Sequence, residues 1–164
     1  MYLQSTQAQS TASSLWNNTA PTSSVFSIGS GSSGTNSNGA TYVAYCFAAI
    51  PGYSAFGSYT GNGSTDGTFV YCGFRPRFVF YKSTAGNWGV LYDTSENSYN
   101  VASQYLIADS SAAQNNGGAT NNGTLDILSN GFKLRDTALQ SNNSGTTYIY
   151  MAFAENPFQN ALAR

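Results

Sequence analysis

The chain has 164 residues, a size that fits one domain with a substantial core. Charged residues make up only 8% of it, and six Lys and Arg against seven Asp and Glu leave a net charge of -1. This balance excludes a nucleic-acid or anionic-membrane partner held by counterion release. Histidine is absent, which excludes a Ser/His/Asp triad and every zinc site that needs imidazole.

The remaining composition predicts an all-β protein. Gly, Ser, Thr and Asn, together with 12 Tyr and 10 Phe, are residues of turns and strands. No apolar run approaches the roughly 20 residues that span a bilayer. The start, Met1-Tyr-Leu-Gln-Ser, lacks the basic and apolar stretches of a secretory signal. We therefore expect a chain that folds in the cytoplasm without an export signal of its own.

Residues 1–24 are dominated by Ser, Thr, Gln and Asn and predict a polar N-terminal arm. Such an arm is too polar to fold onto its own core, so we expect it to lie against a neighbouring chain in a homo-oligomer or a larger assembly. From Val25 onward, short apolar runs alternate with turn clusters at the spacing of a sandwich or barrel, which predicts a β-sandwich domain over residues 25–164.

The alternating pattern places strands in the first part of this domain and again near its end. Ala85-Gly-Asn87 predicts a tight hairpin between two of them. Residues 94–123 predict a long polar connection with one short helical turn near 101–106. The predicted strands cover residues 24–29, 41–49, 53–60, 67–74, 77–83, 87–93, 124–128, 131–135 and 146–154.

Two segments resemble each other at an offset of 106 residues. Residues 36–51 align with residues 142–157, with identity at Asn, Gly, Thr, Tyr, Phe, Ala and Pro, and Phe26 keeps the same offset to Phe132. Seven matches in 16 positions exceed the roughly one match that residue frequencies of about 7% or less would give. This predicts two equivalent hairpins. The alternative, two strands that merely share β-favouring residues, does not account for the glycines and prolines.

Both cysteines, Cys46 and Cys72, lie in apolar alternating runs. We expect two buried, reduced thiols, because a protein that folds in the cytosol stays reduced. A disulfide is the alternative, and it requires adjacent strands and an oxidising compartment.

Candidate site residues are few. Trp88 and the tyrosines, with Asn and Asp side chains near them, offer a stacking platform for sugar rings, or else they are core and interface residues. Arg75 and Arg77 suit either a carboxylate of a neighbouring subunit or the protection of a sheet edge. The candidate glycan or interface residues are Trp88, Tyr92, Asp93, Asn97, Arg75 and Arg77.

Catalytic, metal and cofactor sites are not predicted. A glycosidase needs two facing carboxylates, and nothing singles out a pair among the seven in the chain. Residues 93–100 place oxygen ligands at alternating positions but lack the central Gly and closing Glu of a calcium loop, so we interpret them as a polar turn.

Several phrases resemble a domain of structural proteins in tailed bacteriophages, often found at their C-terminal ends. The resemblance covers residues 25–158 and rests on the runs 42–48, 57–63, 73–77, 130–134 and 148–158, which include Gly57-Ser-Tyr-Thr-Gly-Asn-Gly63 and Asn130-Gly-Phe-Lys-Leu134. It implies a jelly-roll or concanavalin-like sandwich and a role on the virion surface in capsid decoration, tail or fibre, with no catalytic residue.

We therefore expect an antiparallel β-sandwich that is a non-enzymatic virion component, with other virion proteins as partners. A neutral surface and abundant aromatic residues agree with permanent subunit interfaces. The alternatives are a module that binds host-cell glycans and, with less support, a glycan-cleaving enzyme.

Overall fold

The computed structural model describes residues 3, 5–10, 13–30, 34–116 and 123–157. It divides into two compact units, one from Met1–Gln9 together with Ala48–Arg164 and the other from Ser10–Phe47. The units are thus divided near residues 9 and 47 and not at residue 24. We call them the sandwich and the small unit.

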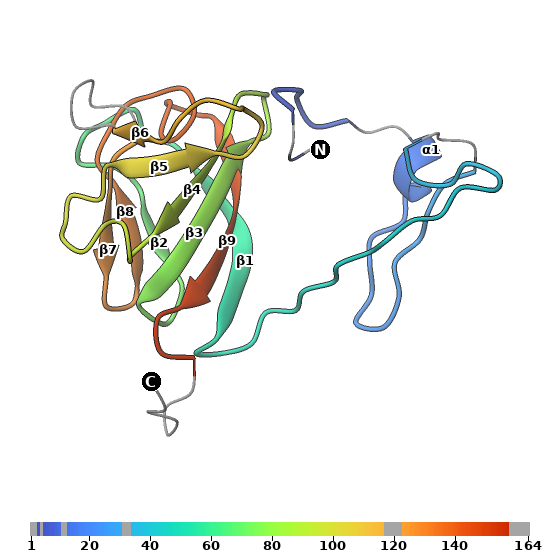
Figure 1. Cartoon of the computed structure of the whole chain (residues 1–164), viewed down its shortest axis with the longest axis horizontal. Coiled ribbons are helices and arrows are strands. Elements are labelled where there is room, and N and C mark those ends of the chain that lie inside the picture. The colour runs from blue at the N-terminus through green and yellow to red at the C-terminus, as the bar shows by residue number, and fades with distance from the viewer. Residues whose placement is uncertain (1–2, 4, 11–12, 31–33, 117–122, 158–164) are drawn as a thin grey trace. The chain divides into compact units, whose positions relative to one another are not determined.

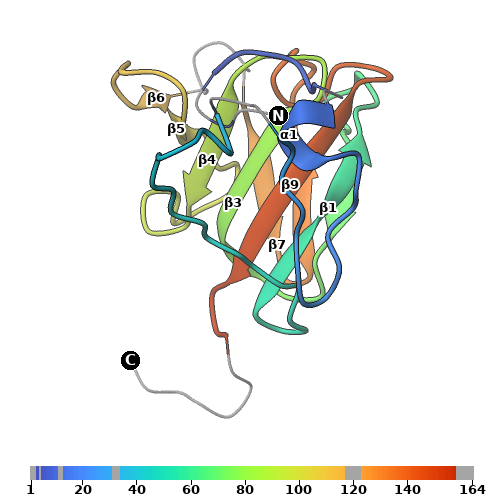
Figure 2. The ribbon, with the colours of Figure 1, turned by 90° about the vertical axis from the view of Figure 1, so that its right-hand side faces the viewer.

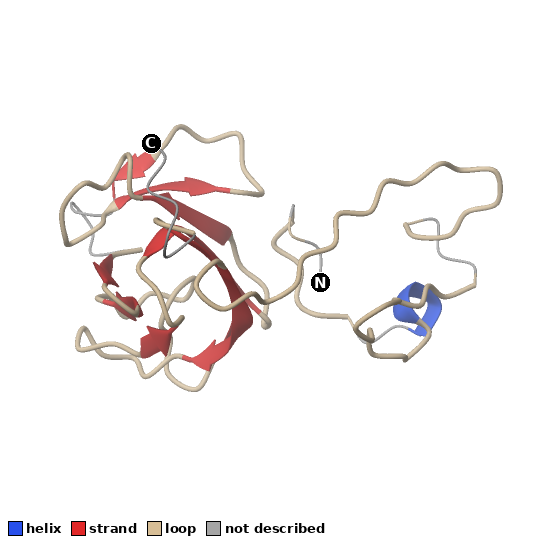
Figure 3. Cartoon of the chain, turned by 90° about the horizontal axis from the view of Figure 1, so that it is seen from below, coloured by secondary structure: helices blue, strands red, loops and turns tan. Residues whose placement is uncertain are grey.

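The sandwich is built from two antiparallel sheets, as the sequence predicts (Figures 1 and 3). The larger sheet has the order β1-β9-β3-β4-β5-β6 and the smaller the order β2-β8-β7. The strands are β1 (Ser54–Thr60), β2 (Phe69–Tyr71), β3 (Pro76–Ser83), β4 (Gly89–Asp93), β5 (Gln104–Ile107), β6 (Asn115–Asn116), β7 (Leu125–Leu128), β8 (Gly131–Leu134) and β9 (Thr147–Ala154).

Strand β9 lies inside the larger sheet, between β1 and β3 (Figure 2). It pairs along its whole length with both neighbours, for example Tyr148 with Tyr59 on one side and Ser83 on the other. Its alternate residues Tyr148, Ala152 and Ala154 are buried, because successive side chains of a strand point to opposite faces. The last strand of the chain therefore completes the centre of the sheet.

The core is unusually rich in tyrosine. Tyr59 stacks on Tyr148 with ring centroids 5.0 Å apart, and it meets Tyr81 and Phe132 edge to face at 6.2 Å. The hydroxyl groups reach backbone carbonyls at the ends of the sheets: that of Tyr59 donates to Ser141 (2.8 Å) and that of Tyr148 to Leu139 (2.8 Å). Buried tyrosines are stable here because each polar end has a partner.

The loop between β8 and β9 is fixed by two buried polar side chains. The Asp136 carboxylate accepts the Thr124 and Ala138 N–H groups at 2.7 and 2.9 Å. The side-chain amide of Asn142 donates to Asn62, to the Ser64 carbonyl and to the Asp136 carbonyl at 2.8–2.9 Å. These bonds order the approach to β9.

Seven of the nine predicted strands are confirmed, from β1 to β4 and from β7 to β9, and so is the hairpin at residues 85–87. The prediction of strands at 24–29 and 41–49 is wrong, because both ranges have an irregular backbone apart from a single bridge between Ile50 and Ser54 just beyond them. The helical turn predicted at 101–106 is also wrong: this range leads into β5. The prediction of two equivalent hairpins at an offset of 106 is wrong as well, because β8 and β9 lie in different sheets and do not pair with each other.

The small unit contains one helical turn, α1 (Ser13–Trp16), which the sequence did not predict. Leu15 is its buried residue, and the Leu15 carbonyl accepts the Gly29 N–H at 2.9 Å. A Cβ atom on Gly29 would lie 2.2 Å from the Ser14 carbonyl oxygen, so glycine permits this close approach. Trp16 and Phe26 meet edge to face at 6.4 Å.

Candidate functional site

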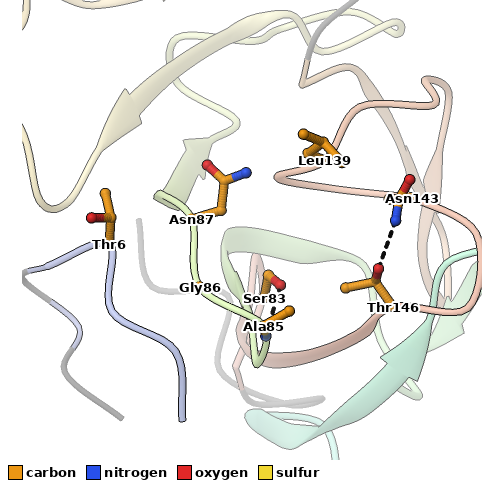
Figure 4. A pocket seen from close by; sticks show the side chains of 8 residues that line it. All are labelled: Thr6, Ser83, Ala85, Gly86, Asn87, Leu139, Asn143 and Thr146. Carbon is orange, nitrogen blue, oxygen red and sulfur yellow. Dashed lines mark hydrogen bonds between the residues drawn. The ribbon is translucent and has the colours of Figure 1, made fainter.

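A polar pocket lies where the N-terminal arm, the β3–β4 turn and the loop before β9 meet (Figure 4). The side-chain amide of Asn143 donates to the Thr146 hydroxyl at 2.8 Å across one wall. The pocket has a volume of about 370 Å³ and is lined by Thr6, Ser83, Ala85, Gly86, Asn87, Leu139, Asn143 and Thr146. Its lining offers hydroxyl and amide groups without a charge, which suits an uncharged polar ligand.

Lys82 joins the N-terminal arm to the β3–β4 turn, two segments that line this polar pocket. Its ammonium donates to the Ser5 carbonyl and to the Asn87 carbonyl, each at 2.6 Å, and pairs with the Asp109 carboxylate at 3.2 Å. The side chains of Lys82 and Asp109 are both fully buried. Because a buried charge is costly unless it is paired, this contact fixes the arm and the turn to each other.

The first residues of the arm are attached to the chain's own sandwich. The Asn87 N–H donates to the Thr6 carbonyl at 3.0 Å, and the Gln9 N–H donates to the Thr84 carbonyl at 2.8 Å. The expectation that the arm is too polar to fold onto its own core is therefore wrong for residues 5–9, since backbone bonds satisfy even a polar segment on its own fold. A contact of the arm with a neighbouring chain stays a prediction.

The predicted glycan residues are not all on the surface. Trp88 is 41% exposed, whereas the Tyr92 ring is buried in the core. The Tyr92 hydroxyl donates to the Gly123 carbonyl and lies 3.3 Å from the Tyr81 hydroxyl. Tyr92 is thus a core residue with no face for a sugar ring.

Asp93 and Asn97 form the turn after β4. The Asp93 carboxylate accepts the Ser95 N–H at 2.6 Å, and the Asn97 side chain accepts the N–H groups of Ser103 and Gln104 at 2.9 Å. This is the polar turn that the sequence predicts. Its side-chain groups are used to connect β4 with β5.

Arg75 and Arg77 pair within the chain. Arg75 Nε lies 2.7 Å from Glu155, and a guanidinium nitrogen of Arg77 lies 4.0 Å from the Asp93 carboxylate. These pairs are half-exposed and contribute little free energy. Both arginines thus have a carboxylate partner within the chain and require none from another subunit. Protection of a sheet edge stays a prediction for them.

A second pocket of about 190 Å³ lies beside the turn after β4. It includes the predicted residues Tyr92 and Asp93, but its walls are otherwise mostly core and strand residues. Its lining is Phe78, Leu91, Tyr92, Asp93, Glu96, Gln104, Tyr105, Leu106 and Gln114.

Each of the seven carboxylates has a polar partner. Asp66 and Asp126 both contact Arg135, at 3.6 and 2.6 Å, so that a guanidinium lies between them. The others pair with Lys82, Arg75, Arg77, the Gln114 amide or, for Asp136, backbone N–H groups. Burial raises the pKa of Asp136, although its N–H and hydroxyl donors oppose this shift.

The buried phenols are donors and not acids at neutral pH. Burial raises the pKa of Tyr59, Tyr81 and Tyr92 well above the usual value, and neighbouring phenols and Asp136 raise it further for Tyr59 and Tyr81. A catalytic acid or base works best near the operating pH, so these groups suit structure and not proton transfer.

The small unit presents a run of exposed apolar side chains. Along residues 41–47, Val43 is 77%, Tyr45 83% and Phe47 62% exposed. We call this run the 41–47 segment. Two sequence signals could have identified this segment: its apolar residues alternate with others, and it repeats the sequence of β9. Both signals led instead to the prediction of a strand.

Cys46 lies in the 41–47 segment and is exposed, which contradicts the prediction of burial. Cys72 is half-buried, and burial raises the pKa of its thiol to about 12. Both are free thiols, as predicted.

The described part of the chain holds no group of three or more Cys, Asp or Glu side chains placed to bind a metal ion. Within the same described ranges, no helix is long and apolar enough to cross a membrane.

Comparison with known proteins places the chain in one family. A family model described as "Domain of unknown function (DUF7483)" matches residues 1–157, nearly the whole length, so the chain belongs to this family. No curated protein and no solved structure matches it.

Proposed function

We propose that this member of the DUF7483 family is a non-enzymatic structural subunit on the surface of a bacteriophage particle. The observation that carries the proposal is the 41–47 segment, in which Val43, Tyr45 and Phe47 are exposed within five residues of a chain with a net charge of only -1. Contiguous exposed apolar side chains of this size mark surfaces that other proteins cover, and aromatic residues are enriched at the centre of such interfaces.

The arrangement of the carboxylates supports a non-enzymatic role. Arg135 lies between Asp66 and Asp126, and the remaining acids are bound to cations, amides or backbone donors. A glycosidase needs one acid that stays protonated and one free carboxylate across an open cleft. Because these acids are paired, they do not supply the free carboxylate that such a reaction needs.

We further propose that the sandwich is of the jelly-roll or concanavalin-like type and that the 106-residue repeat is a true structural repeat. Its turns support this. Gly39 and Gly145 have φ angles of 75° and 74°. The turns that contain them close with equivalent bonds, from the Ala40 N–H to the Ser37 carbonyl (3.1 Å) and from the Thr146 N–H to the Asn143 carbonyl (3.1 Å).

The same turns are bound by equivalent tyrosines. The Ser37 N–H donates to the Tyr42 hydroxyl at 2.9 Å, and the Asn143 N–H donates to the Tyr148 hydroxyl at 3.0 Å. The two turns are therefore two copies of one local backbone arrangement.

The direct test is whether the chain is part of a particle. Antibodies against the purified chain should label the outside of intact phage particles whose genome encodes it, in electron micrographs, and peptides of the chain should be present in purified particles by mass spectrometry. Particles that carry neither label nor peptides would contradict the proposal. Release of sugar from bacterial polysaccharide by the purified chain would contradict its non-enzymatic part.

The polar pocket supports glycan binding as a second candidate function. Its hydroxyl and amide lining, with the exposed Leu139 at its rim, offers the donors, acceptors and apolar contact that sugars use. Binding to a glycan array should be lost in Asn143→Ala and kept in Tyr99→Ala, a change at an exposed residue outside the pocket. Equal binding by both variants, or none by the parent chain, would remove this candidate.

A further inference from the structure

The two copies of the repeat differ in the exposure of the residues that they share. In the sandwich, Tyr148, Phe132 and Leu134 are fully buried. Their equivalents in the small unit, Tyr42, Phe26 and Ile28, are 44%, 44% and 43% exposed. An apolar residue that is kept in sequence but exposed in structure indicates a surface that is covered in another state.

The polar members of the repeat show the same difference. Asn142 is fully buried and its side chain joins the β1–β2 loop to its own β8–β9 loop, whereas its equivalent Asn36 is exposed. The identity between the copies is therefore highest at positions that a complete sandwich buries. In the small unit, Asn36 and Tyr42 bond locally, to the Gly29 carbonyl and the Ser37 N–H, but these bonds do not account for the Phe at position 26.

The environment that fits residues 36–47 is the position of β9 in the sandwich, between β1 and β3. There, Tyr42 would stack as Tyr148 does on Tyr59, and Phe47 would take the place of Phe153 among neighbouring rings. Cys46 would stand at Ala152, which is fully buried, and adds only one sulfur atom. The least favourable exchange is Ala44 for the half-buried Tyr150.

An intact copy of this chain is not the best partner. In each copy, β9 already fills the position between β1 and β3. This strand is tethered to its own sandwich, which gives it an effective concentration of the order of mM against any competing strand. The acceptor must therefore be a sandwich whose own β9 is missing or displaced.

We infer that residues 36–47 are a donor strand that completes a second sandwich of this same fold, one whose own β9 is missing or displaced. Main-chain pairing on both edges would supply affinity, and the buried Asn, Tyr and Phe positions would set the register. This inference rests on the proposed function, since it names the partner of the 41–47 segment in the assembly.

The first test places the donor sequence in the acceptor position of the full-length chain. Residues 142–153 are replaced by residues 36–47, which changes seven positions: N143S, S144N, T146A, I149V, Y150A, M151Y and A152C. The matched control inserts residues 35–46 instead. This shift by one residue turns every side chain of the strand to the opposite face.

The in-register graft should unfold cooperatively, with a thermal midpoint within about 15 °C of the parent chain. The shifted graft should show no cooperative transition by circular dichroism. An in-register graft that is as poorly folded as the shifted one would overturn the equivalence of the two segments.

The second test asks whether the donor acts between chains. The full-length variant Tyr148→Asp/Ala152→Asp places two charges at buried positions of its own β9, which frees the slot between β1 and β3. At about 50 μM it should sediment as concentration-dependent assemblies in which each chain completes the next. Head-to-tail exchange of this kind is open-ended.

Adding Tyr42→Asp to that variant should abolish the assemblies, because the donor then carries a charge at the same position. A sedimentation profile unchanged by Tyr42→Asp would overturn the donor function. A negative result in the graft test or in the sedimentation test does not change the antibody labelling of particles. The failure of this inference is therefore distinguishable from the failure of the proposed function.

Discussion

Alanine at the two equivalent tyrosines should have very different effects on the sandwich. Tyr148 is fully buried, and a tyrosine of this kind buries about 150 Å² or more, which at about 25 cal/mol per Å² corresponds to about 4 kcal/mol. Loss of its hydroxyl also removes the donor of the Leu139 carbonyl and the acceptor of the Asn143 N–H. Tyr148→Ala should therefore lower the free energy of unfolding by about 4 kcal/mol.

The same change at the half-exposed Tyr42 should cost the sandwich less than about 1 kcal/mol, because Tyr42 belongs to the small unit. Urea denaturation measures both values, with Trp88 fluorescence as the reporter in a Trp16→Phe background, which leaves no tryptophan in the small unit. At a slope of about 2 kcal/mol per M, Tyr148→Ala should lower the urea midpoint by about 2 M. Equal losses for the two variants, or a loss below about 1 kcal/mol for Tyr148→Ala, would refute the assignment of core and exposed copies.

Three further predictions concern other parts of the chain. Lys82→Met should destabilise the sandwich by about 3–5 kcal/mol, because it leaves the buried Asp109 unpaired, and Lys82→Met/Asp109→Leu should recover part of the loss in urea denaturation; a single variant as stable as the parent would contradict this. Iodoacetamide at pH 8 should alkylate the exposed Cys46 rapidly and Cys72 very slowly, with the Cys72 rate rising about tenfold per pH unit towards its pKa of about 12; similar rates at both thiols by mass spectrometry would be the opposite result. Gly145→Ala should lower the thermal midpoint by a few degrees through strain at a φ of 74° alone, since a Cβ there meets nothing within 4 Å, and an unchanged midpoint would show that this turn relaxes.

Strands of the sandwich were predictable because their alternation reports burial on one face. The runs at 77–83 and 146–154 alternate over a long range, and they form the paired centre of the larger sheet. The strand β5 was missed because Gln104–Ile107 is short and lies between polar turns. A strand with little apolar contrast leaves no periodic signal.

The same alternation led to the wrong prediction at residues 24–29 and 41–49. Periodicity shows that a segment suits a sheet, but a strand also needs an edge to pair with. In the sandwich, β9 itself takes the position that the 41–47 segment resembles. The sequence thus indicates the character of this segment and not its state in the free chain.

Among the candidate site residues, the turn of Asp93 and Asn97 was predictable from local spacing, because Asp and Asn bond nearby backbone. The polar pocket was not predictable. Its lining comes from three segments far apart in sequence, including Thr6 and Asn143, and only the fold brings them together. The burial of Tyr92 likewise depends on long-range packing.

The most direct measurement of the central claim is the reactivity of Cys46 in the assembled particle. Cys46 lies near the end of the proposed donor strand, at the position equivalent to Ala152 in the sandwich core. Intact phage particles that contain the chain, and the purified chain at the same concentration, are treated with iodoacetamide and analysed by mass spectrometry, with Cys72 as the internal reference. We predict that alkylation of Cys46 is at least about tenfold slower in the particle, and equal Cys46 rates in the particle and in the purified chain would contradict the account.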